Sequence, residues 1–367
     1  MYYIHSMSIG GAETLVCDYL IELKRRHVDV ALIVNYLSDS FLEKKIKKEG
    51  IIISPIFLNN KSIVARCYNL GLKHSSIPGK RIEKILETFK PDVFHIHTAT
   101  NYLYNVNFSA NKMVYTFHSN VGRYINLLGQ VNEKNLKYLS KKGMHFVAIS
   151  KCIENDIYQY LGTKNVTYIP NGLDIENFRK QKVFRQETRS FYKIEDNTLL
   201  VGHVGRFNKV KNHERIIEIF EEIHKQQENS KLILVGGDDN GNLDHIKQIV
   251  SQKKLSQHVI FAGICDKVAR IISAMDVMLI PSFSESFSLT IIEAQSLGVR
   301  CIASDNLPIE VFCNNNCFRL SLNEPNSRWS DLALNEEECQ WENNLSDFEL
   351  ENVIDKTINL YERIIEK

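Results

Sequence analysis

Short apolar segments alternate along the chain with longer segments in which apolar residues recur at helical spacing. A short apolar run that ends at Gly, Pro or polar residues is typical of a buried parallel strand. The pattern predicts strands at residues 2–7, 28–34, 51–53, 92–97, 112–117 and 145–149, and again at 199–204, 231–235, 258–261, 277–280 and 300–303. Strands that alternate with helices in this way predict the α/β class with doubly wound parallel sheets.

The predicted strands fall into two series that are separated by turn residues. A Pro-Asn-Gly sequence favours a turn at 166–172, and the charged stretch 179–189 is predicted to be a connecting excursion. A chain of 367 residues also exceeds the usual size of a single domain. We therefore expect one Rossmann-like domain at 1–172 and a second at 173–347. The spacing of apolar residues predicts a last helix at 348–366.

Composition narrows the class of protein further. Hydrophobic residues make up 44% of the chain, which is enough to fill a core in each domain. No run of 18 apolar residues occurs, so no membrane-spanning helix is expected. The first residues lack the basic and apolar regions of a signal peptide, so we expect a cytoplasmic protein. Eight cysteines are present without a C-x-x-C pair, and no zinc site is expected from their spacing.

The net charge is +1, but it is unevenly distributed. Residues 1–172 contain 22 Lys and Arg against 13 Asp and Glu, so this part carries +9 and the remainder carries −8. Such asymmetry suggests that the first domain faces an anionic partner. Its densest basic clusters, 24–26 and 44–48, lack the interleaved aromatic residues that stack on nucleic acid, so no nucleic acid is expected. An anionic membrane surface fits these clusters, and so does a solvated helix face without a partner.

The segment 281–293 contains two glutamates, Glu285 and Glu293, between a predicted strand and a predicted helix. Open α/β sheets bind ligands in loops at the carboxyl ends of their strands. The helix that follows offers free N–H groups to an anion, and Ser288 is a candidate cap of this helix. Carboxylates beside an anion site suit a ligand that has both phosphates and hydroxyls. The alternative is a pair of solvated glutamates beside a turn.

Two cations, Arg206 and Lys211, follow the predicted strand 199–204 and precede a helix that Asn212 can cap. Arginine offers phosphate oxygens a planar fork of donors, and lysine offers a point charge. The pair therefore predicts a phosphate site. A basic turn is otherwise an exposed surface, which is our interpretation of the neighbouring Lys209.

Two glycines, Gly10 and Gly11, lie between the first predicted strand and the first helix. They do not form a G-x-G-x-x-G sequence, so the fingerprint of a dinucleotide site is not met.

Three histidines, His95, His97 and His118, lie at the ends of predicted strands. His95 and His97 share one face of their strand because side chains alternate with a period of two. A metal site among them has little support, since no third ligand has a clear spacing and the chain has no D-x-D sequence; we expect no metal. Each histidine can instead be a hydrogen-bonded core or loop residue, which is our interpretation of His95.

Together these motifs resemble those of the retaining, nucleotide-sugar-dependent glycosyltransferases of family 4, of the bacterial type that builds polysaccharides and lipid-linked saccharides. Glu285 and Glu293 match the E-x7-E motif of this family, Arg206 and Lys211 match its G-R-x4-K motif, and the first loop matches its G-G-A-E sequence. The resemblance implies the GT-B fold, in which two Rossmann-like domains face a central cleft. It also implies that the last helix, 348–367, crosses back to the N-terminal domain.

The resemblance implies a role for individual residues as well. Glu285 and His118 would be the catalytic residues that contact the donor sugar, and Glu293 would bind the ribose hydroxyls. Arg206 and Lys211 would neutralise the donor diphosphate. The other donor-binding residues that the resemblance implies are Gly10, Gly11, Ile264, Ser286, Phe287, Ser288 and Leu289. Ser286 and Ser288 stand where the usual motif, E-G-F-G, has glycine.

The sequence thus predicts a hexosyltransferase-type glycosyltransferase that is retaining and metal-independent. It would move a hexose or N-acetylhexosamine from a nucleotide sugar, expected to be a UDP sugar, to a saccharide acceptor that is expected to be lipid-linked, in cell-surface polysaccharide synthesis. The N-terminal domain would bind the acceptor at the inner face of the cell membrane, and the C-terminal domain would bind the nucleotide sugar.

Two alternatives remain open from the sequence. A nucleotide-sugar 2-epimerase shares the GT-B architecture but lacks the pairing of these two motifs. A catalytically silent nucleotide-sugar-binding subunit of a partner glycosyltransferase is the other alternative, for which the two serines leave room.

Overall fold

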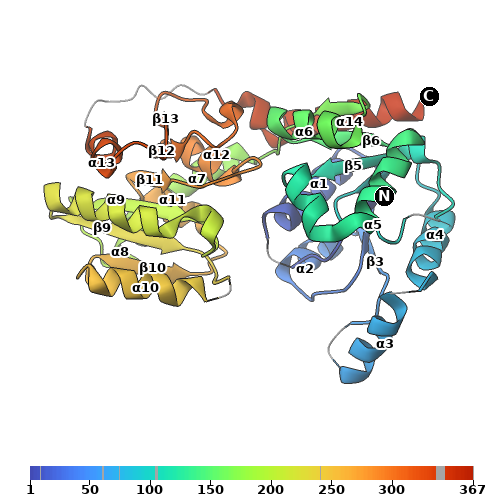
Figure 1. Ribbon diagram of the computed structural model, residues 1–367, viewed down its shortest axis with the longest axis horizontal. Coiled ribbons are helices and arrows are strands. Elements are labelled where there is room, and N and C mark those ends of the chain that lie inside the picture. Colours follow the sequence, from blue (N-terminus) through green and yellow to red (C-terminus); the bar gives the residue numbers. More distant parts are fainter. Residues whose placement is uncertain are drawn as a thin grey trace. The chain divides into compact units, whose positions relative to one another are not determined.

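The computed structural model describes residues 1–8, 10–59, 62–73, 75–103, 106–239, 241–335 and 344–366. The chain forms two compact units, each with its own parallel sheet (Figure 1). Unit 1 comprises Met1–Gly172 and Leu350–Lys367, and unit 2 comprises Leu173–Glu349. The predicted class, α/β with two doubly wound parallel sheets, is confirmed.

Unit 1 is built on a seven-stranded parallel sheet in the order β3-β2-β1-β4-β5-β6-β7. Its strands are β1 (Tyr2–Ile4), β2 (Ala31–Val34), β3 (Ile52–Pro55), β4 (Phe94–Ile96), β5 (Met113–Phe117), β6 (His145–Ala148) and β7 (Val166–Tyr168). Its helices are α1 (Gly11–Arg25), α2 (Phe41–Lys48), α3 (Ile63–Lys73), α4 (Ile77–Phe89), α5 (Val121–Lys141), α6 (Lys151–Leu161) and α14 (Leu350–Ile365). The strand order reverses between β1 and β4, because β2 and β3 lie on one side of β1 and the later strands lie on the other.

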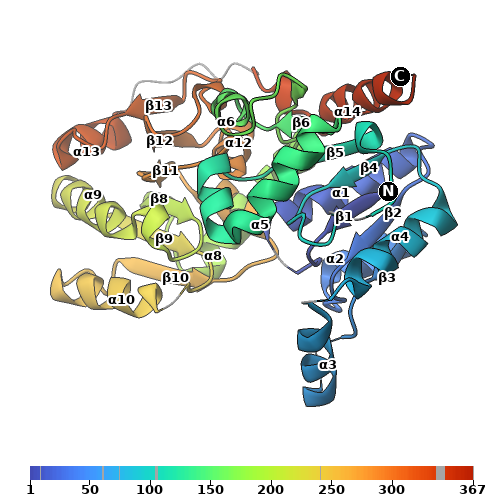
Figure 2. The ribbon, with the colours of Figure 1, turned by 45° about the vertical axis from the view of Figure 1, so that its right-hand side comes forward.

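The central strands of unit 1 are apolar because helices cover both faces of the sheet. Every residue of β1, β2, β4 and β5 is buried, as expected for a parallel sheet in this position. Each buried Leu, Ile or Phe side chain contributes roughly 1.5–3 kcal/mol to stability. The edge strands β3 and β7 are only partly buried, and α3 projects from the rest of unit 1 (Figure 2).

The C-terminal helix α14 belongs to unit 1, in agreement with the prediction that the last helix returns to the N-terminal domain. Its buried residues follow helical spacing and are Val353, Ile354, Thr357, Leu360, Tyr361 and Ile364. The hydroxyl of Tyr361 lies 2.7 Å from that of Tyr2 and 2.5 Å from Nδ1 of His95. Gly172 allows a close approach, since a Cβ there would lie 3.1 Å from Cβ of Val353.

Unit 2 is built on a six-stranded parallel sheet in the order β10-β9-β8-β11-β12-β13. Its strands are β8 (Leu199–Val204), β9 (Ser230–Val235), β10 (Val259–Gly263), β11 (Val277–Ile280), β12 (Arg300–Ser304) and β13 (Cys317–Leu320). Its helices are α7 (Ile175–Lys180), α8 (Arg185–Phe191), α9 (His213–Gln226), α10 (Asn242–Gln252), α11 (Val268–Ala274), α12 (Leu289–Ser296) and α13 (Asn326–Leu334). The strand order reverses between β8 and β11. A buried cluster that includes Phe220, Leu232 and Trp329 forms part of its core.

Three segments differ from the sequence-based expectation. The strands β7 and β13 were not predicted, and β7 occupies part of the predicted turn at 166–172. The interpretation of 179–189 as a connecting excursion is wrong, because this segment lies within unit 2 and ends in α8. Arg189 of α8 is 1% exposed, donates to the carbonyl of Ala274 at 2.9 Å and lies 3.4 Å from Asp276. This contact fixes α8 to the body of unit 2.

In the part of the chain that the structure describes, no helix combines the length and apolar character needed to cross a membrane.

Candidate functional site

The carboxyl edge of the sheet in unit 2 brings together the two motifs that the sequence singled out. β8 and β11 are hydrogen-bonded neighbours, and the strand order reverses between them. Arg206 and Lys211 follow β8, whereas Glu285 follows β11. Open α/β sheets bind ligands at such a reversal point, because the loops of the two strands diverge there and leave a crevice.

Backbone and side-chain hydrogen bonds hold the two loops together. Asn208 accepts from the N–H of Lys211 at 3.2 Å and starts a 3₁₀ turn, Lys209–Lys211. The N–H of Phe283 donates to the carbonyl of Val210 at 2.9 Å. The predicted capping of α9 by the side chain of Asn212 is not observed. Its Nδ2 instead donates to the carbonyl of Pro281 at 3.0 Å.

An ion pair completes this junction. Nζ of Lys211 lies 2.6 Å from Oε1 of Glu285, and the side chains are 20% and 13% exposed. The hydroxyl of Ser282, which is fully buried, donates to the same oxygen of Glu285 at 2.9 Å. Arg206 is exposed and makes no ion pair with the residues that the structure describes. Its guanidinium is therefore available to an anion.

The loop between Glu285 and α12 has an unusual backbone conformation at Ser288. This residue has φ 89° and ψ 82°, in the region that favours glycine, whereas Ser286 has no positive φ. The prediction that Ser288 caps α12 is wrong for its side chain, which makes no capping hydrogen bond. Its Oγ is buried and has no hydrogen-bond partner in the part of the chain that the structure describes. Phe287 is buried, and its ring lies 5.5 Å from that of Phe348. Leu289 begins α12 and is partly buried.

Glu293 lies one turn into α12 and is partly buried. Burial raises the pKa of its carboxyl from 4.5 to about 7, although the nearby charge of Lys211 acts in the opposite direction. Removal of a carboxylate from water disfavours its charged form. Glu293 is thus poised to change its ionisation near neutral pH.

The loops after β8, β9 and β10 approach one another through their backbones. Gly236 has φ 154° and donates its N–H to the carbonyl of Gly263 at 2.9 Å. A Cβ at Gly236 would lie 2.0 Å from the carbonyl oxygen of Gly205, so no other residue fits here without movement. Ile264, which follows β10, is 74% exposed at this edge of the sheet.

The glycine loop of unit 1 lies at the reversal point of its own sheet. Gly10 precedes α1 with an extended backbone, φ −171°, and Gly11 is the first residue of the helix. A Cβ at Gly10 would lie 2.3 Å from Oε2 of Glu13, whereas a Cβ at Gly11 would meet no atom within 4 Å. Gly11 therefore leaves open space at the N-terminus of α1.

Of the three histidines, His95 lies in β4, whereas His97 and His118 directly follow β4 and β5. His95 is buried, and both its ring nitrogens are within hydrogen-bond distance of a hydroxyl. Its Nδ1 lies 2.5 Å from the hydroxyl of Tyr361, and its Nε2 lies 2.7 Å from the hydroxyl of Thr116. This is the hydrogen-bonded core residue that we expected. His97 is also buried, and its Nδ1 lies 2.8 Å from Nε2 of His118, which is partly exposed. Burial lowers the pKa of His118 to about 4, so it is neutral at pH 7.

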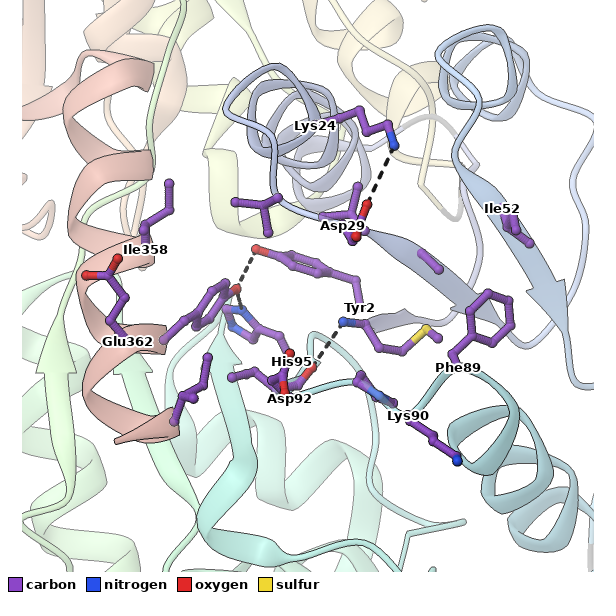
Figure 3. A pocket seen from close by; sticks show the side chains of 18 of the residues that line it. Tyr2, Lys24, Asp29, Ile52, Phe89, Lys90, Asp92, His95, Ile358 and Glu362 are labelled. Carbon is purple, nitrogen blue, oxygen red and sulfur yellow. Dashed lines mark hydrogen bonds and ion pairs between the residues drawn. The ribbon is translucent and has the colours of Figure 1, made fainter. Parts of the chain in front are cut away.

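A separate hollow of about 700 Å³ opens at the amino ends of β1 to β4, in unit 1. Figure 3 shows Ile358 and Glu362 of α14 on one side of it and Phe89 and Lys90, from the end of α4, on the other. Tyr2 and His95, which are labelled in the same view, both form hydrogen bonds to the hydroxyl of Tyr361. Because the hollow is at the amino ends of the strands, it is distinct from the candidate site loops, which follow the carboxyl ends.

Sequence reasoning did not identify the contacts by which three residues hold the candidate groups in place, although it named two of them, Asn212 and His97, for other reasons. Ser282 and Asn212 bond to the loop that carries Glu285, and His97 bonds to His118. Their positions directly after strands or beside a motif are the only sequence signals. Within the described ranges, no cluster of three or more His, Cys, Asp or Glu side chains is arranged to hold a metal ion.

Comparison with known proteins identifies the family of both units. A model described as Glycosyltransferase Family 4 matches residues 9–177, and one described as Glycosyl transferases group 1 matches residues 184–334. The putative glycosyltransferase EpsF of Bacillus subtilis is 30% identical over 169 residues, which are 46% of this chain and 44% of that protein. N-acetyl-alpha-D-glucosaminyl L-malate synthase of Bacillus anthracis is 27% identical over 58% of this chain and 56% of that protein. The chain thus spans about half the length of the curated relatives it matches.

Solved structures share the fold at low sequence identity. Anabaena HepE in complex with UDP has a TM-score of 0.79 at 17% identity, with 99% of each chain covered. WaaG, a glycosyltransferase involved in lipopolysaccharide biosynthesis, has a TM-score of 0.65 at 12% identity and covers 100% of this chain and 98% of its own. These neighbours confirm the GT-B type of fold for two parallel-sheet Rossmann-like units. The two family models together span most of both units, so the chain carries a Glycosyltransferase Family 4 domain followed by a Glycosyl transferases group 1 domain.

Proposed function

We propose that this protein is a retaining glycosyltransferase that moves a hexose or N-acetylhexosamine from a UDP sugar to a saccharide acceptor. The observation that carries the proposal is the arrangement of Arg206, Lys211 and Glu285 at the strand-order reversal of unit 2. A diphosphate needs cationic groups and N–H donors, and a sugar needs carboxylates that accept from its hydroxyls. Both kinds of group lie on adjacent loops here.

In the proposed reaction, the bond between the anomeric carbon and the β-phosphate oxygen of UDP breaks, and a bond to an acceptor hydroxyl oxygen forms. The acceptor proton passes to the departing phosphate, so that UDP and the glycoside are the only products. Arg206, Lys211 and the N–H groups at the start of α12 stabilise the negative charge that develops on UDP, which is an electrostatic contribution to catalysis. Attack from the same face as departure retains the anomeric configuration, and no carboxylate of the protein is required as a nucleophile.

We assign other residues to parts of the donor on the basis of the family resemblance. Glu293 accepts hydrogen bonds from the ribose hydroxyls, and the backbone around Ile264 contacts the base. The backbone of the loop from Ser286 to Leu289, with Phe287 anchored in the core, faces the phosphates. In unit 1, we assign Gly10 and Gly11 to the phosphates and His118 to the donor sugar.

The names of the relatives support a role in cell-surface polysaccharide synthesis. WclY of Escherichia coli, 28% identical over 49% of each protein, is described as an O-antigen biosynthesis glycosyltransferase. Solved complexes of HepE contain UDP or UDP-glucose. The HepE complexes support a UDP sugar as donor, and the description of WclY supports a saccharide as acceptor. That this acceptor is lipid-linked is part of our proposal.

Charge favours contact of unit 1 with an anionic membrane surface. With its returning C-terminal segment, unit 1 has 25 Lys and Arg against 17 Asp and Glu. Lys44, Lys47 and Lys48 are exposed on α2 beside the exposed ring of Phe41. The projecting helix α3 has no acidic residue and exposes Ile63 and Leu70. An apolar and basic surface of this kind binds anionic headgroups. We infer a peripheral protein at the inner face of the cell membrane.

The test is transfer from a panel of UDP sugars to lipid-linked saccharides, followed by mass analysis of the lipid and NMR of the new linkage. We expect one donor to give UDP and a lipid product with retained configuration. EDTA should leave turnover unchanged, because Arg206 and Lys211 supply the charge that other enzymes take from a divalent ion. Restoration of lost activity by Mg²⁺ or Mn²⁺ would contradict the metal-independent mechanism.

The same experiment separates the alternatives. An epimerase would convert a UDP sugar without any acceptor. A silent binding subunit would bind UDP tightly and give no product with any donor. Either outcome would replace the proposed function.

A further inference from the structure

His97 and His118 form a hydrogen-bonded pair in unit 1. Nδ1 of His97 lies 2.8 Å from Nε2 of His118, and their ring centroids are 5.1 Å apart. Burial keeps both rings neutral at pH 7, since it lowers the pKa of His118 to about 4 and that of His97 well below its ordinary value. In a neutral pair, one ring nitrogen donates and the other accepts. The bond therefore determines which nitrogen of each ring carries its hydrogen.

The pair is a product of the sheet register. β4 and β5 are parallel neighbours in which His95 is level with Val114. Diagonal neighbours on the same face are then offset by two residues, which pairs His95 with Thr116 and His97 with His118. The first pair is locked at both ring nitrogens of His95 by Tyr361 and Thr116. The second pair continues this row toward the carboxyl ends of the strands, where ligands bind.

Neighbouring rings hold His97 in one orientation. The ring of Tyr2 is stacked on it at 5.0 Å and 14°, and the ring of His95 lies 4.2 Å away. His97 is 8% exposed, and its Nε2 is buried without a hydrogen-bond partner among the described residues. Only Nδ1 is therefore engaged.

The unpartnered nitrogen indicates the direction of the bond. If His118 donated, the hydrogen of His97 would lie on Nε2, as a buried N–H without an acceptor. Such groups are rare because they lose their hydrogen bond to water and gain none in return. If His97 donates from Nδ1, its Nε2 carries no hydrogen, and this arrangement avoids an orphaned N–H.

We propose that His97 is a positioning residue, whose Nδ1–H donates to Nε2 of His118 and thereby holds the hydrogen of His118 on Nδ1. The consequence for the reaction rests on the proposed function, in which His118 contacts the donor sugar. His118 then presents a neutral N–H of fixed direction, and a sugar hydroxyl oxygen accepts from it. Loss of the partner would let His118 adopt the other tautomer and present a bare nitrogen, which cannot donate. Partner groups of this kind fix tautomers in other imidazole sites.

The direct test is a long-range proton–nitrogen correlation spectrum of the intact protein labelled with ¹⁵N-histidine, at pH 7.5 and without substrate. We expect His118 and His97 each to carry hydrogen on Nδ1 and none on Nε2, with assignment from His118→Ala and His97→Asn. A hydrogen on Nε2 of His118 would overturn the proposal. The measurement requires no turnover, so its result does not depend on whether the protein proves to be a transferase.

Two amide variants test the consequence for turnover. In His97→Asn the amide nitrogen can take the place of Nδ1 and still donate to His118, whereas in His97→Gln it extends to the place of Nε2. We expect kcat of the Gln variant to fall about tenfold or more below that of the Asn variant, with KM for the donor little changed. If the larger Gln side chain preserves kcat as well as Asn does, His97 acts only through packing and the proposal is wrong.

His145 offers a matched control on the same sheet. It lies in β6, and both its ring nitrogens are within 2.9 Å of Asn165 and Thr167 rather than of His118. We expect His145→Asn and His145→Gln to have similar kcat values. A separation of equal size there would contradict a specific role for His97.

Discussion

Nζ of Lys211 lies 2.6 Å from Oε1 of Glu285, so a cation that follows β8 is neutralised by a carboxylate that follows β11. The two residues are 74 positions apart in the sequence and reach one another because their strands are neighbours. Both side chains are largely withdrawn from water. The pair thus has a structural role in addition to the roles proposed toward the donor.

Replacement of either partner should destabilise unit 2, because it leaves the other charge partly buried. We expect Lys211→Met and Glu285→Gln each to cost about 1–3 kcal/mol. In a double-mutant cycle, the coupling energy should be about 0.5–3 kcal/mol. Trp329 and Trp341 are the only tryptophans of the chain and both belong to the range of unit 2, so fluorescence during urea unfolding follows this unit. Additive losses would contradict a direct interaction.

Ser288 provides a stability test that does not depend on function. Its φ of 89° is strained for a residue with a Cβ, and its buried Oγ has no hydrogen-bond partner among the residues that the structure describes. Ser288→Gly should therefore raise the free energy of unfolding by about 1 kcal/mol. The matched control is Ser286→Gly, two residues away and without positive φ. It should lower stability by about 0.4–1 kcal/mol, because glycine adds freedom to the unfolded chain. Equal effects at both positions would refute the argument from backbone strain.

The sequence predicted the central strands well because they are continuous apolar runs. It missed β7 and β13, which are short edge strands with partly buried residues and therefore lack such a run. The interpretation of residues 179–189 was also wrong, because a stretch of charged residues normally lies at the solvent-exposed surface. Arg189 is buried because backbone carbonyls and Asp276, 87 residues away, satisfy its guanidinium. Long-range compensation of this kind leaves no local pattern in the sequence.

In the candidate site, too, local features could be predicted from the sequence and long-range contacts could not. Local order and motif spacing predicted that Arg206, Lys211 and Glu285 would follow strands, as they do. The ion pair, the hydrogen bond of Ser282 and the pairing of His97 with His118 depend on which strands are neighbours. Strand order is set by the packing of the whole unit, and no single stretch of sequence specifies it.

Glu293 should make the stability of unit 2 depend on pH. Its pKa is raised by burial from 4.5 to about 7, so the folded state binds more protons than the unfolded state between these values. The free energy of unfolding should therefore fall as the pH rises from 4.5 to 7. In Glu293→Gln this fall should be absent. The free energy of unfolding of the variant minus that of the original protein should therefore be about 1–3 kcal/mol larger at pH 8 than at pH 4.5. Urea unfolding at the two pH values measures it, with the exposed Glu228→Gln as control.

Glu293 should also matter for nucleotide affinity. If its carboxylate accepts from the ribose, Glu293→Ala loses a charge-assisted hydrogen bond worth roughly 1.5–3 kcal/mol, and the Kd for UDP rises about tenfold or more. UDP would bind the charged form of the Glu293 carboxyl. The affinity of the original protein for UDP should therefore increase from pH 6 to pH 8, and the increase should be larger than that of Glu293→Gln. Calorimetry at both pH values decides this. An unchanged Kd in the alanine variant would remove the ribose assignment.

The last prediction concerns the exposed lysines of α2. Lys44, Lys47 and Lys48 are exposed, whereas Lys45 is held by Asp18 at 2.7 Å and is left unchanged. The protein should sediment with anionic vesicles at low salt but not with neutral ones. High salt should release it without detergent, because exposed charges are screened within about 8 Å at physiological ionic strength. Each lysine near such a surface contributes about 1 kcal/mol. Replacement of all three by Glu should therefore weaken vesicle binding by roughly two orders of magnitude or more, with UDP affinity unchanged.

A charge-matched control lies in unit 2. Replacement of Lys225, Lys247 and Lys254, all exposed, changes the net charge equally but leaves α2 intact, so vesicle binding should persist. Equal loss in both triple variants would mean that net charge alone drives binding. Binding to neutral and anionic vesicles alike would instead favour an apolar contact, for which the exposed Ile63 and Leu70 of α3 are the candidates. If no vesicle is bound at all, the lysines of α2 form a solvated helix face, and the acceptor is to be sought among soluble saccharides.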